Sequence, residues 1–167
     1  GWATSTTTYY GRWLALDAHF TFEGEGGTIT SAPEGTQLAP WGEGDAAVAD
    51  GKGTLSGWTG KPVDVRTMPS AARTGYNWIG WYASAEEARA AEEASVRDGQ
   101  AIENFAPPAA GLVTQLPEKF DWNASGVQTN EAGEPVSCNT SYYAAWQPAR
   151  ALMMFDPTMG SINVDSD

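Results

Sequence analysis

Cysteine and histidine are scarce in this chain of 167 residues, and their scarcity excludes several kinds of site. Cys138 is the only cysteine, so neither an internal disulfide nor a zinc site built from cysteines can form. We expect it to be a small packing residue. His19 is the only histidine, and it lies in a segment where apolar and polar residues alternate. This alternation predicts a strand with His19 on its polar face, so a catalytic histidine is not expected.

Positive charge and long apolar runs are also lacking. Twenty-one acidic residues face nine basic ones, which gives a net charge of −12. Such a surface repels phosphate groups and anionic lipid, so we expect no nucleic-acid partner. No apolar run approaches the roughly 18 residues that cross a membrane, so no membrane insertion is expected in this segment. We interpret the acidity as a source of solubility, and expect neither a metal nor an organic cofactor.

What the sequence does contain is an internal repeat, in which residues near the C-terminus match those near the N-terminus at an offset of 133. Between positions 7 and 29, eight of 23 aligned residues are identical without a gap. Roughly one or two identities would be expected by chance. The identical pairs are Thr7/Thr140, Tyr9/Tyr142, Tyr10/Tyr143, Trp13/Trp146, Ala18/Ala151, Phe22/Phe155, Gly27/Gly160 and Ile29/Ile162.

A second, gapped match defines the repeating module. Residues 1–5 resemble residues 80–84, and each stretch precedes a Thr/Ser-Tyr-Tyr-x-x-Trp element. The first and last tryptophans of this pattern are 11 residues apart in the first copy and 65 apart in the second. The predicted organisation is the C-terminal part of a preceding repeat at 1–13, a complete module at 14–148 with an insertion at about 85–135, and the start of a following repeat at 149–167.

Periodicity and turn signals predict the elements of the complete module. A glycine-rich turn at 24–27 between two strands predicts a hairpin. Most of 31–62 is expected to be loops around short strands. Asn130 to Pro135 is expected to be a turn, and Phe120-Asp121-Trp122 is expected to pack an inserted segment onto the core. The predicted elements are strands at 16–22, 28–30, 61–65, 76–82 and 136–146, and a helix capped by Ser84 and Glu87 and stopped by Gly99.

Two of these elements carry residues of interest for function. In strand 76–82, strict alternation places Trp78 on one face with Tyr82, and Ile79 on the other with Trp81. This strand is predicted to be a core strand, with an aromatic sugar-binding platform as the alternative. In the helix, the acidic residues are interpreted as a solvated face; they are Glu86, Glu87, Glu92 and Glu93.

Three blocks of the sequence, in order, resemble the Listeria–Bacteroides repeat, also called the internalin B repeat, of bacterial surface proteins. Residues 19–27 resemble its opening strand, V-T-F-D-x-N-G-G. Residues 69–82 resemble P-x-x-x-R-x-G-Y-x-F-x-G-W-Y, with Trp78 at the usual Phe. Residues 140–146 resemble x-T-x-Y-A-x-W. The long stretch at 31–62 and the helical insertion after Tyr82 depart from the family pattern.

The resemblance implies a β-grasp-like repeat module. Together with the predicted helix, this gives the expected fold class: α+β, mainly β, a β-grasp-like repeat module with a helix-containing insertion. It also implies a non-enzymatic module of a bacterial cell-surface or secreted protein, a stalk or spacer or an adhesive domain that binds a partner. The expected partners are neighbouring repeats of the same chain and a host or matrix protein or glycan. The family carries no catalytic residues, so none is transferred.

Three alternatives remain open at this point. The first is carbohydrate binding, with Trp41, Trp58 and Trp122 as stacking platforms in the longer loops. The second is hydrolysis by paired carboxylates, such as Glu23 with Glu25 or Glu118 with Asp121, although neighbouring carboxylates are expected by number in so acidic a chain. The third is a covalent crosslink from one of the three lysines to an Asn or Asp side chain, which would suit a stalk.

Overall fold

The fold is α+β and mainly β, as the sequence predicts. The structure is a computed structural model, and it describes residues 7–31, 38–39, 51–63, 66–120 and 126–150. One helix, α2 (Ala85–Ala94), lies in these ranges. The strands are β1 (Asp17–Glu23), β2 (Thr28–Ser31), β3 (Leu38–Ala39), β4 (Lys52–Trp58), β5 (Ser70–Ala72), β6 (Tyr76–Tyr82), β7 (Val96–Arg97), β8 (Gln100–Ala101), β9 (Leu112–Val113), β10 (Val127–Thr129) and β11 (Pro135–Pro148).

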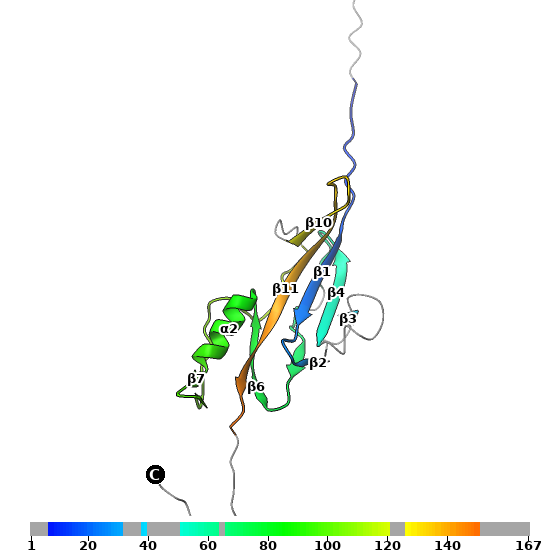
Figure 1. The fold of residues 1–167 in the computed structure, drawn as a ribbon. Helices are drawn as coiled ribbons and strands as arrows, with labels where there is room; N and C mark the ends of the chain where they lie inside the picture. The colour runs from blue at the N-terminus through cyan, green and yellow to red at the C-terminus, as the bar shows by residue number, and fades with distance from the viewer. Residues whose placement is uncertain (1–6, 32–37, 40–50, 64–65, 121–125, 151–167) are drawn as a thin grey trace, which may run out of the picture.

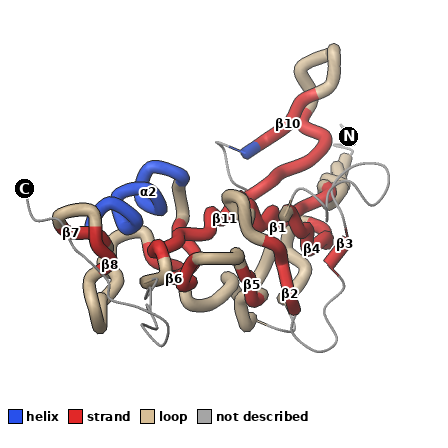
Figure 2. Tube along the Cα trace, turned by 60° about the horizontal axis from the view of Figure 1, so that its bottom comes forward, coloured by secondary structure: helices blue, strands red, loops and turns tan. Residues whose placement is uncertain are grey.

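The first and last long strands, β1 and β11, lie side by side and parallel at the middle of the main sheet (Figure 1). Their register runs from Asp17 opposite Ser137 to Glu23 opposite Tyr143. The other strands give the order β3-β4-β1-β11-β6-β9, with β10 also paired to β11. Two small sheets, β2-β5 and β7-β8, lie outside this order, and Figure 2 places β7 and β8 beside α2.

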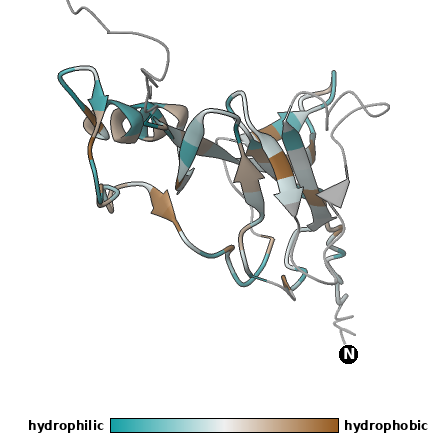
Figure 3. Cartoon of the chain, turned by 90° about the horizontal axis from the view of Figure 1, so that it is seen from below, coloured by the Kyte–Doolittle hydropathy of each residue, from teal (hydrophilic) through white to brown (hydrophobic). Residues whose placement is uncertain are grey.

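The core lies on one face of the main sheet. Alternate residues of β1 point into it, and this alternation appears in Figure 3 as brown and pale bands along the strands. The ring centroid of Phe22 lies 5.5 Å from that of Trp81 and 5.8 Å from that of Tyr142. Cys138 is buried in the same core, as predicted. The buried members are Ala18, Phe20, Phe22, Val63, Ala71, Trp81, Leu116, Phe120, Cys138, Tyr142, Ala144 and Trp146.

Strand β6 departs from the strict alternation expected of it. Ala145 pairs with Gly80 and Trp146 pairs with Trp78, so Ile79 is an extra residue on β6. This β-bulge shifts the side-chain alternation by one residue. As a result Trp78 contacts Trp81, and Ile79 packs with Tyr82, which corrects the predicted faces. The C-terminal half of β6 is buried as a core strand, whereas Trp78 remains exposed.

The predicted hairpin between β1 and β2 does not form. The tight turn is present, with Gly27 N donating to Gly24 O, but β2 leaves the main sheet and pairs with β5. The antiparallel partner of β1 is β4, in a stretch expected to be mostly loop. Of the strand expected at 61–65, residues 64 and 65 lie outside the described residues, and within 61–63 the pairing is limited to an isolated bridge between Pro62 and Lys119.

Helix α2 begins as predicted and ends early. Glu87 N donates to Ser84 Oγ, which satisfies one of the amide groups at the start of the helix. The helix stops at Ala94 with Ser95 as its C-cap, and Gly99 lies instead in the turn between β7 and β8. The alanine face packs closely on the sheet, since Ala88 and Ala91 are buried against Tyr82 and Ala145.

The segment that separates β6 from β11 contributes to the sheet and to the core. β9 pairs with β6, and Asn130 to Glu134 form the predicted turn between β10 and β11. The rings of Phe120 and Phe20 stack with their centroids 4.5 Å apart, which confirms the predicted packing for Phe120, while Asp121 and Trp122 lie outside the described residues. This segment is therefore part of the folded unit.

Candidate functional site

The face of the sheet opposite the core carries mostly polar side chains. From β1 and β4, His19 Nδ1 and Ser56 Oγ lie 3.1 Å apart. From β1 and β11, Thr21 Oγ1 donates to Asn139 Oδ1 at 2.7 Å. Asn139 in turn donates to Ser141 Oγ at 3.2 Å. These bonds tie three adjacent strands together and hold the Asn139 amide in one orientation.

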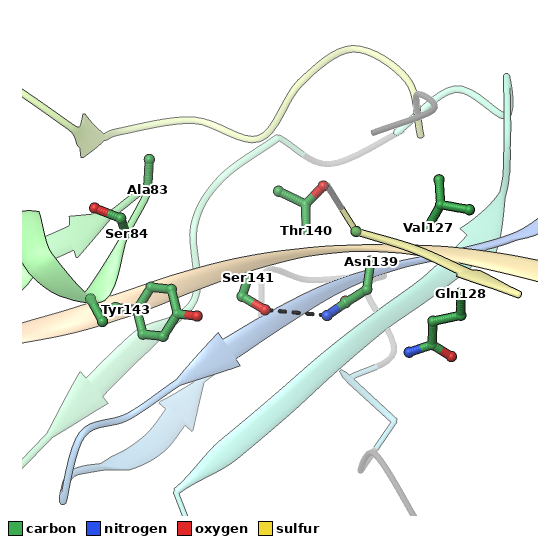
Figure 4. Close-up of a pocket in the computed structure, with 10 residues that line it drawn as sticks. Ala83, Ser84, Val127, Gln128, Asn139, Thr140, Ser141 and Tyr143 are labelled. Carbon is green, nitrogen blue, oxygen red and sulfur yellow. Dashed lines mark hydrogen bonds between the residues drawn. The ribbon is translucent and has the colours of Figure 1, made fainter. Parts of the chain in front are cut away.

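A pocket of about 460 Å³ opens where this polar face meets a gap in the sheet. On this side of β11, β10 pairs up to Cys138 and β6 pairs from Tyr143 onward, so the residues between them face no described strand. Figure 4 shows the lining residues around this gap. They are Ala83, Ser84, Ala85, Gly126, Val127, Gln128, Asn139, Thr140, Ser141 and Tyr143.

The chemistry of this pocket is polar and uncharged. Its described lining has no acidic or basic side chain, but it has hydroxyl groups, two amides and the phenol ring of Tyr143. Ser84, at the rim, caps the start of α2. A neutral ligand rich in hydroxyl groups matches this set of donors and acceptors better than an ionic one.

The predicted ligand-binding tryptophans are not brought together around the pocket. Trp58, at the end of β4, is 54% exposed and shares the polar face with its register partner Asp17. It does not line the pocket. Trp41 and Trp122 lie outside the described residues. The pocket was missed by sequence reasoning because it arises from the pairing of strands that are distant in the chain.

The alternative chemical roles receive little support from the described residues. Glu23 forms a salt bridge with Lys52 at 2.9 Å, and Glu118 lies 3.4 Å from Arg66, while Asp121 is outside the described ranges. All three lysines are exposed, whereas a crosslink needs a lysine enclosed beside a carboxyl group. In the described part of the chain, no three His, Cys, Asp or Glu residues gather as metal ligands would. Helix α2, the one helix among the described residues, has 10 residues and is too short to span a bilayer.

The surroundings of His19 also shift its titration. Burial lowers the pKa of His19, and the nearby charge of Asp17 opposes this shift. The imidazole therefore loses its proton more readily than an exposed histidine does. It lies on the polar face as predicted, at the β1–β4 pairing.

Glu92 is a residue whose role the sequence did not reveal. Its Oε1 accepts a hydrogen bond from Trp146 N at 2.9 Å, at the bulge where β6 and β11 lose register. Burial raises the pKa of Glu92, and the bond from Trp146 opposes this shift. Glu92 is therefore not part of a solvated helix face, because it joins α2 to the central strand.

Residues 7–14 form an extended aromatic segment that contacts little else. Tyr9, Tyr10, Trp13 and Leu14 are all strongly exposed. Burial of such side chains normally stabilises a protein by about 1.5–3 kcal/mol each, so a row of them in water is unusual. Its residue types are typical of a strand in a hydrophobic core, but these side chains are exposed.

No protein-family model matches this chain, and comparisons with curated proteins and with solved structures also find no match.

Proposed function

We propose that this chain is a non-enzymatic repeat module of a bacterial cell-surface or secreted protein, where it acts as a stalk or spacer or as an adhesive domain that binds a partner. In this proposal residues 14–148 are one complete β-grasp-like module. Residues 1–13 and 149–167 belong to the repeats before and after it. Neighbouring repeats are then its first partners, and a host or matrix protein or glycan is a further one.

The observation that carries the proposal is the contrast between repeated residues. Tyr9 is 89% exposed, and its counterpart Tyr142 is 6% exposed in the core. Trp13 is 94% exposed, and its counterpart Trp146 is 1% exposed. These motif residues are thus buried in the copy on β11 and exposed to solvent in the copy at residues 7–13. The difference is explained if residues 7–13 are the last strand of a preceding module that is not part of this sequence.

The repeat motif residues behave as framework, which supports a structural role. Arg73 lies over the ring of Tyr76, with 3.9 Å from Cζ to the ring centroid, and it also donates to Glu25 O. Trp81 Nε1 donates to Pro69 O within the core. The sheet supports a β-grasp-like arrangement, because a parallel central pair is flanked on each side by an antiparallel strand.

The proposal is tested by the cellular location of the parent protein in its source organism and by the shape of the parent protein in solution. An antibody raised against this chain should label intact, unpermeabilised cells or the culture medium, and brief protease treatment of whole cells should remove the cell-bound label. Scattering from the full-length parent should fit an extended array of beads. Label found only after permeabilisation, or a compact parent, would contradict the proposal.

Carbohydrate binding is the second candidate, and the neutral pocket and exposed Trp58 favour it. Aromatic faces and fixed hydroxyl and amide groups are the usual means of binding sugars. A glycan array probed with the chain tests this function. Trp58→Ala tests the role of the exposed tryptophan, and Asn139→Ala tests the role of the neutral pocket. Silence on the array together with unchanged tryptophan fluorescence would remove this candidate.

A further inference from the structure

The path of the chain through the sheet has a mechanical consequence. The chain enters the module at the start of β1 and leaves it at the end of β11, and these strands are adjacent and parallel. Figure 1 shows the N-terminal segment leaving one end of the sheet and the C-terminal segment leaving the opposite end. Tension along the polypeptide therefore pulls β1 and β11 in opposite directions along their own length.

We propose that β1 and β11 form a force-bearing clamp that resists extension of the polypeptide. The clamp consists of the seven register pairs from Asp17–Ser137 to Glu23–Tyr143. This inference rests on the proposed stalk function and adds a physical task to it. It concerns the resistance of one module to pulling, which can be measured without knowing where the parent protein lies.

The resistance follows from the direction of the load. When two paired strands slide past each other, all their cross-strand hydrogen bonds must lengthen together before any is replaced. When the same strands are separated from one end, the bonds break one after another, and each step needs little force. Forced unfolding depends on the barrier to the first such event, so the loading direction decides the result.

Side chains reinforce the clamp on both faces of the sheet. On the core face, the ring of Tyr142 lies near the rings of Phe20 and Phe22, with centroids 6.0 and 5.8 Å apart. On the polar face, Thr21 donates to Asn139 across the same two strands. Near the end of β11, Trp146 Nε1 donates to Gly24 O, just beyond β1. Sliding must break each of these contacts together with the backbone bonds.

The clamp also shields the rest of the module from tension. The segment between Glu23 and Ser137, which includes α2, β6 and β10, lies between the two clamp strands along the chain. While the clamp holds, force passes directly from β1 to β11. These elements therefore carry little tension, whereas the pocket residues on β11, such as Asn139, are part of the loaded strand.

Single-molecule force spectroscopy on the whole 167-residue chain tests the clamp. The chain is held either by its two ends or by its N-terminus and residue 132, at the turn before β11. For the second geometry the chain carries Ala132→Cys for attachment, and Cys138→Ala is present in both so that the attachment thiol is unique. The first geometry loads the clamp lengthwise, whereas the second separates it from one end. We expect a clearly higher unfolding force in the first geometry, and equal or reversed forces would overturn the proposal.

A pair of matched threonine variants separates the clamp from general stability. Thr21→Val removes the bond to Asn139 within the clamp, and Thr54→Val changes a neighbouring buried threonine on β4, outside it. We expect a lower end-to-end unfolding force for Thr21→Val and no loss for Thr54→Val, in chains whose near-ultraviolet circular dichroism shows native folding. An unchanged force for Thr21→Val would contradict the proposal. If the antibody labels the cell surface but the unfolding force is equal in the two pulling geometries, the clamp is rejected and the proposed function is retained.

Discussion

The indole ring of Trp146 lies against Gly27, so closely that a Cβ atom built on residue 27 would be 2.3 Å from Trp146 Cζ2. The same indole donates from Nε1 to Gly24 O at 2.8 Å. The end of β11 is thus locked onto the turn that follows β1. Both partners of this contact recur at the offset of 133, as Trp13 and Gly160. In the proposed repeat organisation, the same contact is expected to close the neighbouring modules.

Gly27→Ala should destabilise the module. The added methyl group cannot share the space of the Trp146 ring, and overpacking of this kind costs about 1–3 kcal/mol in the free energy of unfolding. Urea denaturation followed by tryptophan fluorescence measures the loss. Gly11→Ala is the control, because a Cβ there meets only Trp13 Nε1 at 4.0 Å, and its counterpart in β11 is already Ala144. Equal stability of Gly27→Ala and the unchanged chain would show that Trp146 packs elsewhere.

Replacement of Glu92 should separate its acceptor role from its charge. Glu92→Ala leaves the Trp146 amide at the bulge without its partner, which should cost about 1–3 kcal/mol. Glu92→Gln keeps an oxygen acceptor and should retain most of the stability. Thermal denaturation of both variants at one pH measures the difference. If Gln were as damaging as Ala, the carboxylate charge rather than the hydrogen bond would be the stabilising feature.

The pH dependence of the Glu92 contribution has a definite sign. Because burial raises its pKa in the folded state, the folded chain holds this proton more tightly than the unfolded chain does. The contribution to stability is therefore complete below the unfolded pKa and is lost as the pH rises through the folded pKa. The side chain of the Glu92→Gln variant does not titrate, so this variant does not lose stability in this way. As the pH rises from the unfolded pKa through the folded pKa of Glu92, the free energy of unfolding of the variant relative to the unchanged chain should therefore increase. Stability curves that stay parallel across it would contradict the assignment.

Thr54→Val should stabilise the module. Within the described residues, Thr54 Oγ1 is buried without a hydrogen-bond partner, so its hydroxyl has lost water and gained no bond. Valine fills the same space, and a gain of about 1 kcal/mol is expected in urea denaturation. Thr21→Val is the matched control on the paired strand, and it should lose stability because Thr21 does donate, to Asn139. A loss for Thr54→Val would indicate that its hydroxyl has a bound water or another partner in solution.

Local signals in the sequence predicted the local structure correctly. The cap at Ser84, the buried alternation of β1 and the turn at Asn130 each depend on residues a few positions apart. Strand β4 was missed because its apolar pattern is hidden by glycine. Gly57 is required there, since a Cβ would lie 2.4 Å from Phe120 Cε2, a contact with a residue far along the chain.

Pairing between distant strands explains the other differences. The partner of β2 is β5, although the glycine turn after β1 is typical of a hairpin. The bulge at Ile79 and the acceptor role of Glu92 both arise where β6, β11 and α2 meet. The neutral pocket follows from where β10 ends and β6 begins along β11. None of these relations leaves a periodic signal in the sequence.

Residues 7–13 are proposed to be the last strand of a preceding module, and a hybrid chain tests this proposal most directly. In the hybrid, a copy of residues 14–139 is placed directly before residue 7, so that Thr7 stands where Thr140 stands in the complete module. If the proposal holds, the added copy folds by using residues 7–13 as its β11. Trp13→Ala in the same hybrid is the control, since it removes the counterpart of the buried Trp146.

Hydrogen exchange at the amides of residues 7–13 is the deciding measurement. We expect slow exchange in the hybrid, close to that of residues 140–146, and fast exchange both in the 167-residue chain and in the Trp13→Ala hybrid. Fast exchange in the hybrid, with the added copy unfolded, would contradict the proposal.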